Sequence, residues 1–134
     1  MVTQAQERQL LETAKVIAVV GYSNDPTRTS YQIGKFLKQV GYTVYPVNPS
    51  VSEIDGEKVY ATLADVSEPI DIVNVFRRSE YLAGVVDAAI AVQAKAVWAQ
   101  LGVFDNDAAA KAEAAGLTMV MDTCIKVSYN QLMR

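Results

Sequence analysis

The chain has 134 residues, of which 51% are hydrophobic, and it carries a net charge of −3. This length suits one ordinary domain, residues 1–134, whose folding buries roughly two-thirds of the unfolded surface without disulfide or metal staples. The chain has no histidine and a single cysteine, Cys124, which excludes an internal disulfide, histidine-dependent nucleophiles and a cysteine-based metal cage. The negative charge argues against nucleic acid as a partner. No apolar run approaches the ~20 residues of a membrane span, so we expect a cytoplasmic protein without membrane contact.

Apolar runs of strand length alternate with helical segments along the whole chain. The run Val16–Val20 is continuously apolar, which is typical of a central parallel strand covered on both faces. Residues 50–69 look irregular, apart from an extended piece at Lys58–Tyr60 and a helical turn at Leu63–Asp65. In chain order we expect helix 4–14, strand 16–20, helix 31–40, strand 43–47, strand 70–76, helix 79–93, strand 96–99, helix 106–116, strand 117–121 and helix 127–133.

Cap residues mark where several of these helices begin. Thr3 and Gln6 fit a capping box for the first helix. The stretch Thr29–Gln32 fits a second capping box, so we expect the next helix to begin at about Ser30. Ser79 is the expected cap of the third helix, and Asp105 or Asn106 starts the fourth.

Strands that alternate with helices of about ten residues indicate βαβ units with right-handed crossovers. We therefore predict an α/β protein with a Rossmann-like, doubly wound parallel sheet between two layers of helices. The five main strands are expected in the order 3-2-1-4-5.

In such a sheet, ligands bind outside the carboxyl ends of the strands, near the point where the strand order reverses. Reading the end of each strand gives the candidate site. The residues expected there are Gly21, Tyr22 and Ser23; Pro46, Val47, Asn48 and Pro49; Val75, Phe76, Arg77 and Arg78; Gln100, Leu101 and Gly102; and Asp122, Thr123 and Cys124.

The loop after the first strand has the features of a phosphate site. Gly21 lets the backbone turn, Ser23 offers a hydroxyl, and the helix that begins near Ser30 directs N–H groups and its positive dipole end at the loop. Arg28 lies in this loop, and guanidinium groups donate paired hydrogen bonds to phosphate. With Arg77 and Arg78 on the same edge of the sheet, we predict phosphate binding rather than an ordinary strand–helix connection. Two aromatic residues, Phe76 and Tyr22, either stack on an adenine or cover the core.

The sequence argues against a nicotinamide or flavin dinucleotide. Those cofactors require Gly-x-Gly-x-x-Gly and an acidic residue after the second strand. Here no second or third glycine follows Gly21 at that spacing, and the second strand ends in Asn48-Pro49. An arginine can hold a ribose phosphate, so an NADP-dependent oxidoreductase remains an alternative.

Taken together, these stretches resemble the CoA-binding domain family, stand-alone relatives of the nucleotide-binding domain in the succinyl-CoA synthetase α subunit. The resemblance covers about residues 10–134. The matching stretches are Val19–Ser23 with Pro26, Arg28 and Ser30, Gly41-Tyr42, Tyr45–Pro49, Asp71–Val73, Val75–Arg78, Trp98–Gly102, Glu113–Leu117 and Cys124.

The resemblance implies that the cofactor is coenzyme A. It would place the pyrophosphate at the Gly21–Ser23 loop and the following helix start, supplemented by Arg28. The Asn48 region and Phe76–Arg78 would flank the adenosine with its 3′-phosphate. The stretch Gln100–Gly102 would line the side along which the pantetheine arm leaves.

We expect binding of CoA or an acyl-CoA without catalysis, as in a carrier or sensor. No nucleophile–base pair is evident, and the only ionisable candidates at strand ends are Asp71, Asp122 and Lys126. In the synthetase the phosphorylated histidine belongs to a second domain, so the resemblance does not carry ligase activity here. A third alternative is a nucleotide-binding subunit whose protein partner supplies catalysis, and a homo-oligomer is also left open.

The C-terminal segment departs from the family. The family commonly ends in a Cys-x-x-x-Glu-His-x-Arg-Leu-like segment, whereas Ser128, Tyr129 and Gln131 replace the glutamate, histidine and arginine here. No role in ligand contact is therefore carried over to this segment. Cys124 is either a small apolar filler or the partner of the CoA thiol in a mixed disulfide.

Overall fold

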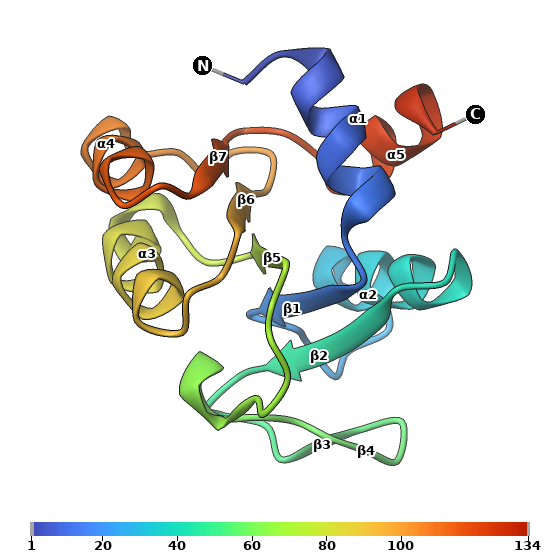
Figure 1. Ribbon diagram of the computed structural model, residues 1–134. Helices are drawn as coiled ribbons and strands as arrows, with labels where there is room; N and C mark the ends of the chain where they lie inside the picture. Colours follow the sequence, from blue (N-terminus) through green and yellow to red (C-terminus); the bar gives the residue numbers. More distant parts are fainter. Residues whose placement is uncertain (1, 134) are drawn as a thin grey trace.

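Five parallel strands form the centre of the computed structural model, which describes residues 2–133 (Figure 1). They are β1 (Val16–Val20), β2 (Thr43–Val47), β5 (Ile72–Val75), β6 (Ala96–Ala99) and β7 (Thr118–Val120). The helices are α1 (Gln4–Thr13), α2 (Thr29–Gln39), α3 (Leu82–Ala91), α4 (Asn106–Ala114) and α5 (Ile125–Leu132). Short 3₁₀ turns lie at Leu63–Asp65 (η1) and Ser79–Tyr81 (η2), and β3 (Glu53–Ile54) pairs with β4 (Glu57–Lys58) in a small hairpin. The predicted alternation of strands and helices is confirmed.

Between residues 2 and 133, every helix is too short or too polar to cross a membrane.

The predicted strand order is wrong in one respect. The sheet runs β2-β1-β5-β6-β7, so the third main strand, β5, lies on the free side of β1 and not beyond β2. Pro46 explains the difference. The Pro46 carbonyl accepts the Tyr60 N–H at 2.9 Å, so the hydrogen-bonding side of this residue faces away from β1. A further strand on that side could not form a complete hydrogen-bond ladder with β2, because proline has no N–H to donate. The structure therefore makes β2 an edge strand, and Tyr60 adds only an isolated bridge to it.

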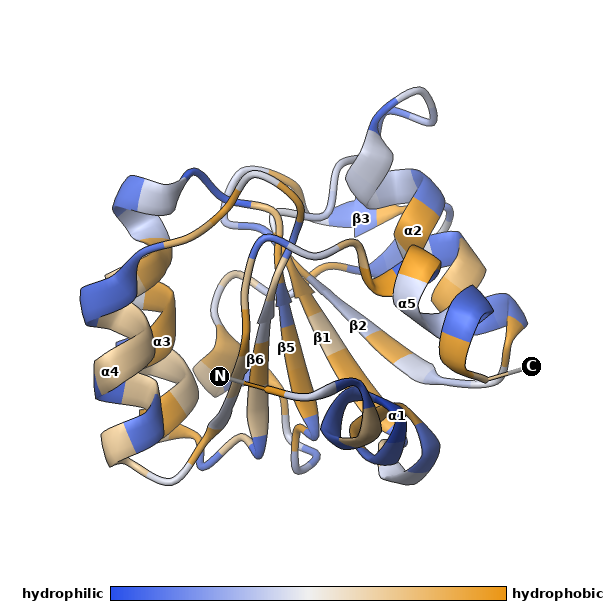
Figure 2. Ribbon diagram, turned by 90° about the horizontal axis from the view of Figure 1, so that it is seen from above, coloured by the Kyte–Doolittle hydropathy of each residue, from blue (hydrophilic) through white to orange (hydrophobic). Residues whose placement is uncertain are grey.

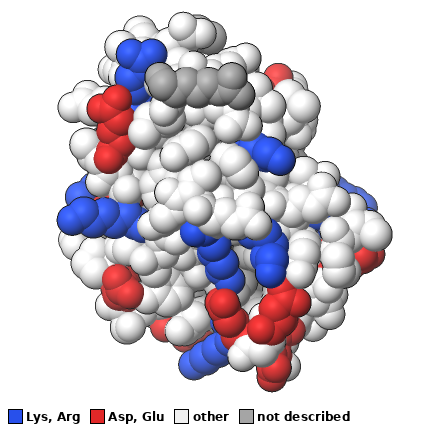
Figure 3. Space-filling view, turned by 90° about the vertical axis from the view of Figure 1, so that its right-hand side faces the viewer, with Lys and Arg blue, Asp and Glu red and all other residues white. Residues whose placement is uncertain are grey.

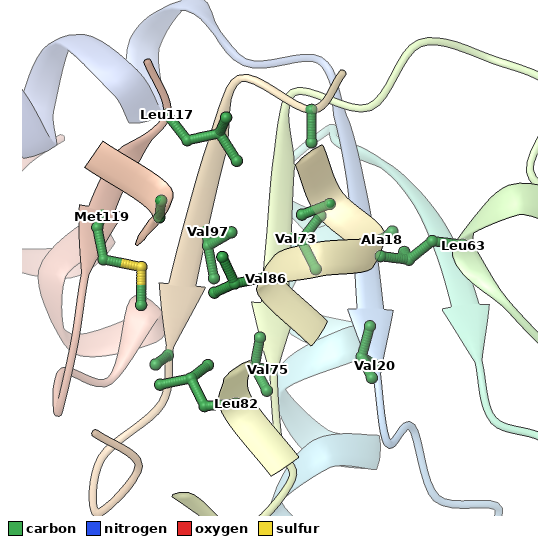
Figure 4. Packing of buried hydrophobic residues seen from close by; sticks show 14 of the residues in the cluster. Ala18, Val20, Leu63, Val73, Val75, Leu82, Val86, Val97, Leu117 and Met119 are labelled. Atoms are coloured by element: carbon green, nitrogen blue, oxygen red, sulfur yellow. The ribbon is translucent and has the colours of Figure 1, made fainter. Parts of the chain in front are cut away.

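Both faces of the sheet are buried, which gives the three layers that the sequence predicted. Helices α3 and α4 cover one face, while α1, α2 and α5 cover the other (Figure 2). On the first face, Val73, Val75 and Val97 pack under Leu82 and Val86 of α3 (Figure 4). Trp98 fills the second face and is fully buried there. Continuous apolar runs such as Val16–Val20 follow from this double coverage.

Helix capping agrees with the sequence at α1 and α4 but not at α2 and α3. Both hydrogen bonds of the Thr3–Gln6 box are present, and Asp105 accepts N–H groups of the first turn of α4. By contrast, α2 begins one residue early, at Thr29, so Arg28 takes the N-cap position and its side chain makes no capping bond. Ser30 Oγ accepts the Ser23 N–H. Ser79 starts η2 and does not cap α3, since its hydroxyl bonds the loop after β6.

The segment between β2 and β5 contains more structure than expected. Its hairpin turns at Asp55 and Gly56, whose φ values of 52° and 80° lie in the left-handed region. Ion pairs fasten the hairpin to α2, with Lys35–Asp55 at 3.3 Å and Lys38–Glu57 at 2.8 Å. Figure 3 shows basic and acidic side chains intermixed on this side of the molecule. The helical turn predicted at Leu63–Asp65 is confirmed as η1.

Candidate functional site

The strand order reverses between β1 and β5, because the chain leaves β1 toward α2 on one face and leaves β5 toward α3 on the other. The crevice at this point is formed by Gly21 and Phe76. A Cβ at Gly21 would lie 3.1 Å from the Phe76 carbonyl oxygen, and Gly21 has a φ of +88°. Both the conformation and the space therefore favour glycine here. The predicted order would have left the loop after β5 two strands away from Gly21; in the structure they touch.

A cavity of about 380 Å³ opens on the α2 side of this crevice. Its lining consists of hydroxyl-bearing side chains, one cation, one aromatic ring and a glycine: Gly21, Ser23, Thr27, Arg28, Thr29, Ser30 and Phe76.

Hydrogen bonds between nearby residues fix the shape of this loop. The Ser23 N–H donates to Ser30 Oγ at 2.9 Å, and the Asp25 N–H donates to Ser23 Oγ at 3.0 Å. The Asp25 carboxylate accepts both the N–H and the hydroxyl of Thr27, and these bonds lower its pKa. Arg28 is the N-cap residue of α2 but makes no capping bond, and it is exposed. An anion in this cavity would meet Arg28 and the positive end of α2 together.

A second cavity of about 290 Å³ lies on the α3 side of the same crevice. Val20 and Val47 contribute to it from the strands, Leu63 from η1 and Val85 from α3. Arg77 enters this mostly apolar space with its guanidinium carbon 4.5 Å from the centroid of the Tyr81 ring, a cation–π geometry.

Phe76 and Arg77 separate the two cavities. Phe76 lines the first cavity and Arg77 the second. Successive residues at the end of a strand point to opposite faces, so two neighbours in sequence serve two sides of the sheet. Arg78 lines neither cavity, and its exposed side chain lies 3.5 Å from Glu80.

Tyr22 covers the core and does not face a ligand. Its side chain is 1% exposed and packs edge-on against Tyr31, with ring centroids 6.2 Å apart. Burial, with the nearby Tyr31, Asp55 and Glu57 groups, raises the pKa of Tyr22 to about 12. Of the two roles left open by the sequence, the structure assigns Tyr22 to the core, while the half-buried Phe76 remains available to the cavity.

The predicted residues after β2 hold the loops in place. Asn48 Nδ2 donates to the Tyr22 carbonyl at 3.0 Å, and Asn48 Oδ1 accepts the Ser50 N–H at 2.9 Å. Asn48 thus joins the loop after β2 to the loop after β1. Pro49 and Val47 line the second cavity, while Val75 is fully buried in the core.

The stretch Gln100–Gly102 lines neither cavity. Gln100 is buried, and its amide oxygen accepts the Ile125 N–H at 3.3 Å, which braces the start of α5. The Gly102 N–H donates to Asp122 at 2.7 Å, while Leu101 is 69% exposed.

The three ionisable candidates lie outside the crevice. Asp71 is at the amino end of the sheet, where it accepts the N–H groups of Lys15 and Val16. Lys126 stacks over Phe36, 5.2 Å from the ring centroid, and Asp122 holds Gly102. Cys124 is a free, half-buried residue that precedes α5.

Sequence reasoning missed several residues of both cavities. Thr27 and Thr29 flank Arg28, and their hydroxyls were a signal that could have added them to the phosphate loop. Tyr81 was not predicted as a site residue, because the segment after Ser79 was expected to be regular helix, not η2. The residues Ala61 to Leu63 carried no signal, since nothing in the sequence shows that η1 returns over β2.

Comparison with known proteins gives a consistent result. Residues 15–130 match the family described as CoA binding domain. The chain is 42% identical to the uncharacterized protein YneT of Bacillus subtilis over 127 residues, which is 95% of this chain and 94% of YneT. It is also 40% identical over 57 residues to the α subunit of ADP-forming acetate–CoA ligase II from Pyrococcus furiosus, covering 42% of this chain but 12% of that subunit.

Solved structures show the same relationship. A hypothetical protein from Pyrococcus horikoshii superposes with a TM-score of 0.95 at 34% identity, covering 99% of this chain and 94% of that one. A dinucleotide-forming acetyl-coenzyme A synthetase of Candidatus Korarchaeum cryptofilum superposes with a TM-score of 0.69 at 26% identity, covering 78% of this chain and 25% of the synthetase. The chain thus spans nearly all of its small relatives and a minor part of the large enzymes. It belongs to the CoA-binding domain family.

Proposed function

We propose that this chain binds coenzyme A, or an acyl-CoA, in the crevice between β1 and β5, and that it does so without catalysing a reaction. The observation that carries the proposal is the uncapped N-terminus of α2 beside Arg28, at the switch point of a chain of this family. Unpaired N–H groups, a helix dipole and a guanidinium converge there, and together they favour a phosphate.

The pyrophosphate is assigned to the cavity on the α2 side. Gly21 lets this loop lie against Phe76, and the Ser23 and Thr29 side chains add hydroxyl groups near Arg28. Among residues 2–133 no carboxylate lines this cavity; the nearby Asp25 carboxylate accepts the N–H and the hydroxyl of Thr27.

The adenosine is assigned to the cavity on the α3 side. Its apolar floor of Val20 and Val47 suits a flat base, and Tyr81 and Arg77 offer a stacked aromatic–cation pair at its edge. Arg77 also supplies positive charge for the 3′-phosphate. In the part of the chain that the structure describes, this cavity has no lining carboxylate either, so neither lining offers a carboxylate as a general base.

Titration calorimetry with CoA, NADP and NAD tests the proposal, with Arg28→Ala as the key variant. We expect CoA to bind and Arg28→Ala to weaken binding by about 1.5–3 kcal/mol, the worth of a hydrogen bond to a charged group. Arg8→Ala is the matched control, because Arg8 is an exposed arginine on α1 outside both cavities. Binding of NADP alone would replace the proposal with the oxidoreductase alternative. Unchanged CoA affinity in Arg28→Ala would mean that Arg28 is a solvated surface residue that does not contact the ligand.

A further inference from the structure

A third cavity, of about 630 Å³, lies along the outer edge of β7 and is larger than the two cavities beside β1. We call it the β7 cavity. Its apolar lining includes Phe104, Ala109 and Ala110 from α4 and the loop before it, and Met119 and Met121 from β7 and its end. The volume and the apolar lining are those of a small-molecule site, and methionine side chains adapt to ligands of different shape.

A hydrogen-bonded rim connects this cavity to the crevice. The Phe104 N–H donates to Ser79 Oγ at 3.0 Å, which joins the loop after β6 to the loop after β5. The Gly102 N–H donates to Asp122 at 2.7 Å, which joins the loop after β6 to the loop after β7. Three successive loops therefore form one edge from Phe76 to the mouth of the β7 cavity.

Exposed apolar side chains lie along this rim. Leu101 is 69% exposed and Phe104 is 54% exposed, and Phe104 lines the cavity itself. These two side chains add apolar surface between the crevice and the β7 cavity.

The distance along the rim fits the ligand proposed above. Strands β1 and β7 are separated by three strand spacings, or roughly 14 Å at the usual ~4.8 Å per spacing. An extended pantetheine arm whose pyrophosphate lies at Gly21 would place its thioester near the end of β7.

We propose that the β7 cavity receives the acyl chain of an acyl-CoA, and that this chain is an uncharged aliphatic group. The inference rests on CoA binding at the β1–β5 crevice. Within the described residues 2–133, the lining includes three carboxylates, Glu7, Glu113 and Asp122, and no lysine or arginine. An acyl group that ends in a carboxylate would meet three like charges, so the cavity selects against dicarboxylic acyl groups.

Calorimetry with four ligands tests this: CoA, acetyl-CoA, hexanoyl-CoA and adipoyl-CoA. Each buried methylene is worth about a fourfold gain, so we expect hexanoyl-CoA to bind at least about tenfold more tightly than acetyl-CoA even in a partly open cavity. Adipoyl-CoA has the same number of acyl carbons as hexanoyl-CoA but carries a terminal carboxylate. Adipoyl-CoA is therefore expected not to bind more tightly than acetyl-CoA.

Two tryptophan variants of α4 locate the effect. Ala110 and Ala114 are both exposed on α4, but only Ala110 lines the cavity. Ala110→Trp should abolish the preference for hexanoyl-CoA and leave CoA affinity unchanged, while Ala114→Trp should retain the preference.

Each result has a distinct meaning. Equal affinity for acetyl-CoA and hexanoyl-CoA, with CoA still bound, overturns the acyl site and leaves the proposed function intact. Failure of CoA itself to bind overturns the proposed function and this inference with it. A dimer in gel filtration that Ala110→Trp converts to a monomer would assign the β7 edge to a second copy of the chain instead.

Discussion

Tyr22 connects the core of the protein to the loop proposed for phosphate binding. Its ring is buried beneath α2, and its carbonyl accepts a hydrogen bond from Asn48. Its immediate neighbours are Gly21 and Ser23, which line the first cavity. The position of this ring therefore sets the position of the loop.

Gly34 provides the space that the Tyr22 ring occupies. A Cβ at Gly34 would lie 2.1 Å from the ring, closer than atoms can approach, so Gly34→Ala must displace it. We expect a loss of about 1–3 kcal/mol in the free energy of unfolding, as for other overpacked cores, measured by urea denaturation. Gly84→Ala is the control, because a Cβ on that α3 residue meets nothing within 4 Å and alanine favours helix. Equal effects of the two substitutions would show that Tyr22 packing does not matter.

At the scale of elements, the carboxylate of Asp71 joins two strands at the amino end of the sheet. It precedes β5 and accepts the N–H groups of Lys15 at 2.8 Å and Val16 at 2.9 Å, where β1 begins. Lys95 lies 3.2 Å from the same carboxylate, just before β6. Burial acts to raise the pKa of Asp71, but the two N–H groups and Lys95 outweigh it and lower the pKa below its ordinary value.

A lowered carboxyl pKa stabilises the folded protein at neutral pH and not in acid. The contribution is present above the unfolded pKa of about 3.9 and is lost as pH falls through the folded value. Asp71→Asn should therefore cost about 1.5–3 kcal/mol at pH 7, and the difference from wild type should shrink below about pH 4. Chemical denaturation at both pH values measures this difference in the free energy of unfolding.

Asp87→Asn is the control. It breaks only the exposed pair with Lys111 and should change stability by less than about 1 kcal/mol. A difference for Asp71→Asn that persists in acid would mean that charge is not the cause.

The sequence contained the fold class and most elements, because apolar runs and caps are local signals. It also contained the evidence against the predicted strand order, since a proline in β2 is typical of an edge strand. The hairpin β3–β4 could not be foreseen in the same way, because its strands are two residues each and it is held by Lys35 and Lys38 of α2. The expected capping role of Thr29 failed because α2 begins at Thr29 itself and Arg28 occupies the N-cap position. The expected role of Ser79 failed because Ser79 begins η2 and its hydroxyl accepts the Phe104 N–H.

The residues of the candidate site also fall into two groups, those that local sequence patterns predicted and those that depend on long-range packing. Gly21, Ser23, Arg28 and Phe76 were found because strand ends meet at one edge of a parallel sheet. Phe76 and Arg77 line different cavities because β5 lies next to β1, and the strand order predicted from the sequence did not place these strands side by side. Tyr81 and the η1 residues depend on how distant segments pack, and single-sequence patterns do not carry that information.

For the whole molecule, local and long-range charge act in opposite directions on an anionic ligand. The net charge of −3 repels CoA at a distance, whereas Arg28 and Arg77 attract it within the crevice. Salt screens both terms, since the Debye length falls from about 10 Å at 0.1 M to about 3 Å at 1 M. Attraction at hydrogen-bond distance is larger per charge than repulsion from scattered surface carboxylates, so the local term should dominate.

We therefore expect CoA affinity to fall severalfold when salt is raised from about 0.05 M to about 0.5 M, measured by calorimetry. Arg28→Ala should show a weaker salt dependence, because it has lost one of the attractive charges. Affinity that rises with salt would mean that the net charge outweighs the arginines, and that they do not contact the phosphates.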